Sequence, residues 1–139
     1  MLDRSGFELR RHVSALNEFS SDTLIKGVYY PESEPILRKW AGAKHVVMFD
    51  HATHDGAQSP APGASEPLRY VHNDQTFVTG PRRVRDLLPV HEAAELLKRR
   101  YAIVNLRRPI RHEVDLSPLA LCDSRSIDLH DLVYTNEVA

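Results

Sequence analysis

His72 and Asp74 are the two residues of this sequence whose types and spacing suggest chemistry most directly. They lie in the run "YVHNDQT", residues 70–76, which is predicted to be part of a β-strand. Side chains alternate across a strand, so residues two apart share one face. An imidazole and a carboxylate on one face can hold one edge of a metal ion. Sites with two His and one carboxylate leave open positions on iron(II), which suits oxidation by dioxygen.

The same spacing also has an ordinary interpretation. The chain contains eight histidines, so a His-x-Asp pair is expected by chance in a sequence of this composition. A half-buried strand that ends at a turn would present the same two residues, with Asp74 accepting backbone hydrogen bonds. From spacing alone both interpretations stay open.

The elements that would position the pair alternate between helical and strand-like segments. Helical spacing or capping residues predict helices over residues 4–18, 31–43, 81–88 and 90–101, with a cap at 20–22 and a break at Pro89. Short apolar runs predict extended segments or strands over residues 24–30, 44–51, 68–78, 101–106 and 117–123. Residues 55–67 are rich in Gly, Pro, Ala and Ser without a period, which predicts a flexible loop. Trp40 and Cys122 are predicted to be core residues.

Length and composition limit the class of protein. The 139 residues suit one domain, and 42% hydrophobic with 27% charged residues is typical of a globular chain. The formal net charge of −1 argues against nucleic acid or an anionic membrane as the main partner. A single cysteine excludes an internal disulfide and a cysteine-rich zinc site. Without a secretion signal or a long apolar run, we expect a cytoplasmic protein.

Several short sequence motifs occur in an order that is typical of one family. These motifs include "GVYYPESEPILRKWAGAKHVVMFDHATHD", "LRYVHNDQT", "GPRRVRDLLP", "EAAELLKRRYAIVNLRRPI" and "SPLALCDSRSI". Together they resemble the CmcJ/NvfI family of hydroxylases and desaturases, also called the asaB type. The resemblance covers about residues 26–133.

The resemblance implies an iron(II)- and 2-oxoglutarate-dependent oxygenase of secondary metabolism with a jelly-roll core. It assigns His72 and Asp74 as two iron ligands, with no catalytic residue beyond the metal ligands. It implies a third ligand, a His in a later aromatic-rich segment, which this sequence does not contain. We therefore expect the chain to correspond to the N-terminal half of a family member. Asn105 and Arg108 match a family word and are predicted to line the 2-oxoglutarate pocket, or alternatively to brace a loop by hydrogen bonding. Arg107 stands where the family usually has Trp.

Other histidines are weaker candidates. His91, His112 and His130 match no family motif, so a surface or loop position is the favoured interpretation for each. His51 and His54 lie three apart beside acidic residues and could form a second metal site. A strand end capped by Asp50 and His51 explains them more simply.

The sequence thus predicts an α+β fold, a partial double-stranded β-helix with flanking helices that lacks its C-terminal strands. Residues 1–25 are expected to form a helical extension and residues 26–139 the oxygenase-like domain. The function expected is oxidation of a small secondary metabolite with iron(II) and 2-oxoglutarate. The alternative is a non-catalytic fragment that binds a small partner or forms a homodimer through exposed strands. The sequence leaves open whether this chain is itself an enzyme, the substrate, and the choice between hydroxylation and desaturation.

Overall fold

The computed structural model describes residues 2–53, 71–110, 113 and 118–133. The chain divides into two compact units. The larger unit comprises Met1–Val71 and Ile110–Ala139, and the smaller unit comprises His72–Pro109. The loop predicted over residues 55–67 lies outside the described residues.

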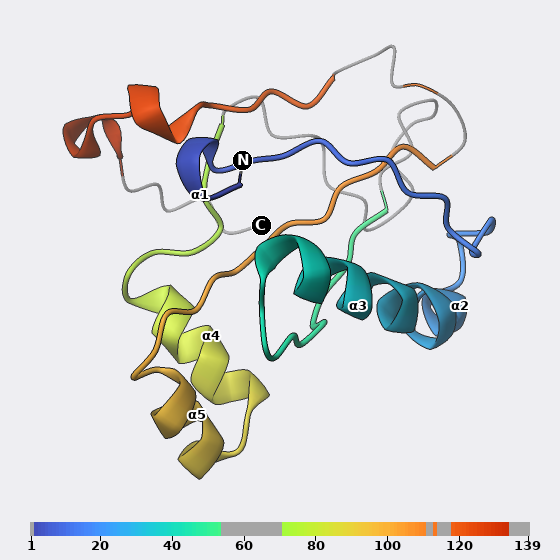
Figure 1. The fold of residues 1–139 in the computed structure, drawn as a ribbon, viewed down its shortest axis with the longest axis horizontal. Helices are drawn as coiled ribbons and strands as arrows, with labels where there is room; N and C mark the ends of the chain where they lie inside the picture. The colour runs from blue at the N-terminus through green and yellow to red at the C-terminus, as the bar shows by residue number, and fades with distance from the viewer. Residues whose placement is uncertain (1, 54–70, 111–112, 114–117, 134–139) are drawn as a thin grey trace. The chain divides into compact units, whose positions relative to one another are not determined.

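One nearly continuous helix dominates the larger unit (Figure 1). It consists of α2 (Asp22–Leu24), the π-helical turn η1 (Ile25–Tyr29) and α3 (Tyr30–Ala41). The Ser21 hydroxyl accepts the N–H of Leu24 at 3.4 Å, and Gly42 ends the helix with a left-handed φ of 64°. The predicted cap at 20–22 and the predicted helix over 31–43 are confirmed. The extended segment predicted over 24–30 is wrong, because helix propagation from the capped turn outweighs the weak β-preference of its residues.

The N-terminal segment is mostly not helical. Only α1 (Leu2–Ser5) forms, and it ends at Gly6, which has a φ of 86°. The helix predicted over residues 4–18 is therefore wrong. Instead, the Glu32 carboxylate of α3 accepts the backbone N–H of Ala15 at 2.7 Å and lies 3.0 Å from His12 Nε2. These contacts connect residues 12 and 15 to α3.

The smaller unit contains two helices that pack side by side (Figure 1). They are α4 (Thr79–Leu87) and α5 (Val90–Leu96), separated at Pro89 as the sequence predicts. Ala93 of α5 is buried, with 1% of its surface exposed. Both predicted helices are confirmed, although α5 stops short of residue 101.

The jelly-roll prediction is contradicted. The described residues contain helices and irregular segments but no β-strand, so the α+β assignment with a partial double-stranded β-helix is wrong for them. Residues 44–51, 71–78, 101–106 and 118–123, predicted as strands, run without regular secondary structure. A strand exists only when a neighbour completes its hydrogen-bond ladder. Among the described residues, backbone hydrogen bonds join only residues within a helix or a turn.

The buried apolar core of the described residues is small. It consists of Leu16, Ile25 and Leu37 in the larger unit and Ala93 in the smaller one. The 3₁₀ turns η2 (Ser124–Ser126) and η3 (Leu129–Asp131) belong to the larger unit, where η2 contacts α1. Cys122 is exposed, so its prediction as a core residue is wrong.

Candidate functional site

The structure brings His72 and Asp74 together. His72 Nε2 lies 3.3 Å from Asp74 Oδ1, and about half of each side chain is exposed. The backbone bends at Asp74 and is not part of a strand, so the strand argument reached the correct proximity for the wrong reason. Both side chains are therefore accessible to solvent.

Two threonines hold the backbone that follows Asp74. The Thr76 hydroxyl accepts the N–H of Thr79 at 3.1 Å, and the Thr79 hydroxyl accepts the N–H of Thr76 at 2.7 Å. The Thr76 hydroxyl also accepts the N–H of Val78 at 3.2 Å. This reciprocal pattern resembles a capping box. It fixes the start of α4 and therefore the direction in which the preceding residues, Asp74 and Gln75, approach the helix.

A second segment of the smaller unit reaches the pair through Asn105. Asn105 Nδ2 donates a hydrogen bond to Asp74 Oδ2 at 3.0 Å, although the two residues are 31 positions apart in sequence. Asn105 thus makes a hydrogen bond to another segment of the chain, and its place in a 2-oxoglutarate pocket stays a prediction. The spacing of residues in the sequence could not predict this contact between Asn105 and Asp74. Arg108 of the same segment is half-buried.

Gly80 lets this second segment approach α4. Gly80 is buried, and a Cβ atom built on it would lie 3.2 Å from the Tyr101 hydroxyl. A side chain at this position would therefore push against Tyr101, where the 101–109 segment begins. The absence of a side chain at residue 80 helps to bring Asn105 within reach of Asp74.

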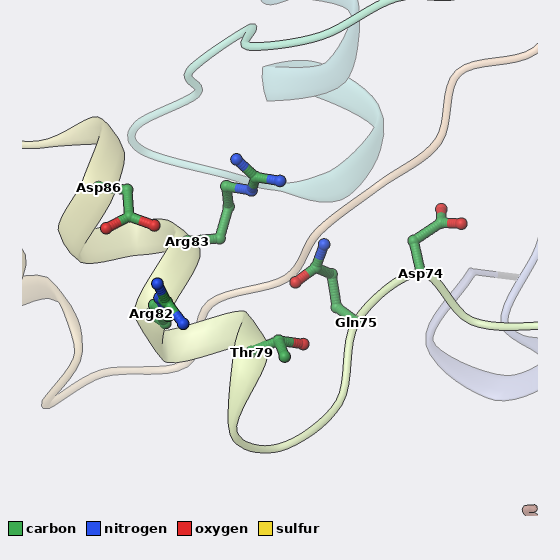
Figure 2. A pocket seen from close by; sticks show the side chains of 6 residues that line it. All are labelled: Asp74, Gln75, Thr79, Arg82, Arg83 and Asp86. Atoms are coloured by element: carbon green, nitrogen blue, oxygen red, sulfur yellow. The ribbon is translucent and has the colours of Figure 1, made fainter. Parts of the chain in front are cut away.

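A hollow of about 410 Å³ lies beside Asp74 (Figure 2). It is a polar hollow that is largely open to solvent. Its charged lining holds two guanidinium and two carboxylate groups. The lining residues are Asp74, Gln75, Thr79, Arg82, Arg83 and Asp86. Figure 2 shows that the last four project from α4, while Asp74 and Gln75 come from the segment before it.

The His72–Asp74 pair fits one edge of a metal site. Two donors bound at right angles, each about 2.1 Å from an ion, are roughly 3 Å apart, close to the observed 3.3 Å. No cluster of three His, Cys, Asp or Glu side chains suited to a metal ion occurs within the described residues. The described chain thus supplies two donors of a possible ligand set.

The other candidate histidines join no cluster of metal-binding side chains within the described residues. His91 is exposed on α5. His130 is exposed on η3, with its Nδ1 2.7 Å from Asp128 Oδ1 in the larger unit. His112 lies outside the described residues, as does His54.

His51 takes part in a polar chain within the larger unit. Its Nδ1 lies 2.8 Å from the Tyr30 hydroxyl and its Nε2 lies 3.1 Å from Asp22 Oδ1. The Asp50 carboxylate accepts the backbone N–H of His51 at 2.8 Å, but the strand end that these residues were predicted to cap does not form in the described part of the chain. Burial, and then the negative charge of Asp50, raise the pKa of the Tyr30 phenol. Because each ring nitrogen of His51 already has a polar neighbour, the arrangement links segment 44–53 to the long helix.

With this geometry in view, comparison with known proteins defines the class. The family model described as "Oxidoreductase/YMDC permease-like domain" matches residues 1–139, and the chain belongs to this family. The similar proteins include hydroxylases, desaturases and nvfI itself, which confirms the resemblance to the CmcJ/NvfI family.

Three relatives show how far the similarity extends. The chain is 33% identical to hydroxylase/desaturase CTB9 of Cercospora beticola, over 96% of this chain and 45% of that protein. It is 29% identical to alpha-ketoglutarate-dependent dioxygenase phiK of a fungal species, over 95% of this chain and 49% of that protein. It is 30% identical to Fe(II)/2-oxoglutarate-dependent dioxygenase nvfI of Aspergillus novofumigatus, over 78% of this chain and 38% of that protein.

The chain spans about half the length or less of these curated relatives. No solved structure matches it. In the part of the chain that the structure describes, no helix is both long and apolar enough to cross a membrane.

Proposed function

We propose that this chain forms part of an iron(II)- and 2-oxoglutarate-dependent oxidoreductase that oxidises a small metabolite. The observation that carries the proposal is the 3.3 Å approach of His72 Nε2 to Asp74 Oδ1 on a solvent-accessible bend. Support also comes from relatives whose names specify hydroxylase/desaturase or Fe(II)/2-oxoglutarate-dependent dioxygenase.

In this proposal His72 and Asp74 hold the iron, and a third ligand comes from outside the described residues. Bound iron with 2-oxoglutarate would supply the oxidising power of dioxygen to the substrate. The two side chains bring one neutral donor and one negative charge. The carboxylate partly offsets the charge of the ion, and the imidazole binds through Nε2 in its neutral form.

The hollow beside Asp74 is the proposed place for a small molecule. Arg82 presents a guanidinium group that suits a carboxylate, while Gln75 and Thr79 offer neutral hydrogen-bonding groups. Arg108 stays a prediction as a residue that binds 2-oxoglutarate. Whether the reaction is a hydroxylation or a desaturation depends on how the substrate lies in this hollow.

An anaerobic iron(II) titration of the purified chain, with and without 2-oxoglutarate, tests the proposal by calorimetry. We expect one iron per chain and tighter binding when 2-oxoglutarate is present. His72→Ala and Asp74→Ala each remove a ligand and should weaken binding by more than roughly 100-fold, the upper range for a residue that only supports a ligand.

His91→Ala is the matched control, because His91 is an exposed histidine in the same unit. It should bind iron as the unmodified chain does. A folded chain that binds no iron, or a His72→Ala variant that binds it unchanged, would overturn the proposal.

A second candidate function is favoured by individual exposed apolar side chains in each unit. Phe77 and Val78 are 87% and 78% exposed, and Leu9 is 96% exposed. Such side chains suit a fragment that binds a partner or forms a homodimer. Light scattering coupled to size exclusion separates the two: a monodisperse monomer that binds iron contradicts the fragment hypothesis, while a dimer without iron supports it.

A further inference from the structure

Asp74 uses its two carboxylate oxygens for different neighbours. Oδ1 lies 3.3 Å from His72 Nε2, and Oδ2 accepts the hydrogen bond from Asn105 Nδ2 at 3.0 Å. An ionised carboxylate only accepts hydrogen bonds, so the amide nitrogen of Asn105 is the atom that must face it. The carboxylate is thus held in one orientation, with Oδ1 toward the histidine.

We propose that Asn105 is a positioning residue for the metal site: it occupies Oδ2 and leaves Asp74 to bind the ion through Oδ1 alone. This inference rests on the proposed function. Carboxylates bind metal ions through one oxygen or through both. A carboxylate bound through both would take an additional position on the ion, whereas binding through Oδ1 keeps that position open for substrate molecules.

The chemistry of an amide suits this role. Asn105 is neutral, so it orients the carboxylate without cancelling the negative charge that attracts the ion. A lysine or arginine in its place would form an ion pair with Asp74 and compete with the metal. Hydrogen-bond partners of metal ligands typically contribute about 10- to 100-fold to metal affinity.

The position of Asn105 is itself supported. The segment that carries it begins at Tyr101, which lies against the side-chain-free Gly80 of α4. Asp74 precedes the same helix across the Thr76–Thr79 turn. Both partners of the hydrogen bond are therefore anchored to the start of α4, which keeps the Asn105 amide close to the Asp74 carboxylate.

Cobalt(II) binding tests the inference, because cobalt(II) is stable in air and its binding is measured without any turnover. We expect Asn105→Ala to bind cobalt(II) about 10- to 100-fold more weakly than the unmodified chain. Asn105→Gln keeps a donor on a longer arm and should recover part of the loss. Asn73→Ala is the matched control: Asn73 lies between the two proposed ligands but makes no side-chain hydrogen bond within the described residues. It should bind as the unmodified chain does.

Infrared spectra of the carboxylate stretches, recorded with ¹³C-labelled Asp, distinguish a positioning role of Asn105 from a purely structural one. Loss of a purely structural contact would leave the mode of metal binding by Asp74 unchanged. The separation of the symmetric and antisymmetric bands distinguishes binding through one oxygen from binding through two. We expect the one-oxygen pattern in the cobalt-bound unmodified chain and the two-oxygen pattern in Asn105→Ala. Circular dichroism confirms that each variant is folded.

The outcomes separate the two proposals. If the unmodified chain binds no cobalt(II) or iron(II), the proposed function fails and the role of Asn105 fails with it. If the unmodified chain binds cobalt(II) and Asn105→Ala binds it equally well with the same infrared pattern, only the role of Asn105 is overturned. Side-chain amide resonances of Asn105 that do not move in Asp74→Ala would also overturn it, because the hydrogen bond would then be absent in solution.

Discussion

Thr76 and Thr79 cap each other at the start of α4, each hydroxyl accepting the backbone N–H of the other residue, at 3.1 and 2.7 Å. These two bonds lie between Asp74 and the helix, so the placement of the His72–Asp74 pair depends on a local turn. The turn is encoded within four residues, and it can be tested without any metal.

We expect Thr76→Val to destabilise the chain by about 0.5–2 kcal/mol, because valine keeps the shape of threonine but loses the hydroxyl that accepts two N–H groups. Urea denaturation measures the change. Thr23→Val in α2 is the control, since Thr23 is an exposed helical threonine without a side-chain hydrogen bond among the described residues. In a double-mutant cycle with Thr79→Val, additive effects would contradict the reciprocal cap.

Glu32 provides a prediction about pH. Burial tends to raise the pKa of its carboxyl, but the N–H of Ala15 with Ser14 and His12 outweighs burial, so the pKa is lowered from its ordinary value of 4.5. Because the folded pKa is the lower one, the carboxylate stabilises the fold above about pH 4.5. This contribution is lost as the pH falls through the folded value.

Glu32→Gln should therefore cost about 1–3 kcal/mol at pH 7. The cost should shrink below pH 4, where the unmodified carboxylate is itself becoming protonated. Thermal unfolding at both pH values measures it. Glu34→Gln on the same helix is the control: Glu34 pairs with Arg38 on the surface and should matter by less than about 1 kcal/mol. An equal cost for both variants at every pH would refute the role of Glu32.

Ala93 tests the packing of α5 within the smaller unit. It is 1% exposed, so Ala93→Leu forces additional methylene groups into a filled space, and we expect a loss of about 1–3 kcal/mol. Ala94→Leu, the same substitution at the next and exposed position of α5, should change the stability little. Denaturation curves in urea compare the two. Equal stability of both variants would show that the surroundings of Ala93 are loosely packed in solution.

Metal removal should lower the thermal stability. If His72 and Asp74 bind an ion in the folded chain only, cobalt(II) at about 100 times its Kd stabilises the fold by about 2.7 kcal/mol. Tm should rise on adding cobalt(II) and return after addition of a chelator, while Asp74→Ala should show no rise. A similar rise in Asp74→Ala would place the ion at another site.

Much of what concerns neighbouring residues could be predicted from the sequence. The helices over 31–41, 79–87 and 90–96 follow from local spacing, from Ser21 and Gly42 at helix ends, and from the break at Pro89. The proximity of His72 and Asp74 follows from two positions of separation. Family membership was also evident from the order of short sequence motifs along the chain. Each of these features depends on residues within a few positions of one another, or on the order of motifs along the sequence. None of them depends on the tertiary structure.

Only the tertiary structure decided the remaining features. It formed a helix across residues 25–29 where β-favouring residues predicted an extended segment. It left residues 7–19 irregular, with the Glu32 carboxylate accepting the N–H of Ala15. It showed apolar runs without ladder partners among the described residues, although their composition favours strands. It placed Asn105 on Asp74 from 31 positions away. The physical reason is common to all of these: a strand, a clamp or a distant hydrogen bond needs a partner whose approach depends on the whole path of the chain, whereas a capped helix contains most of its own partners.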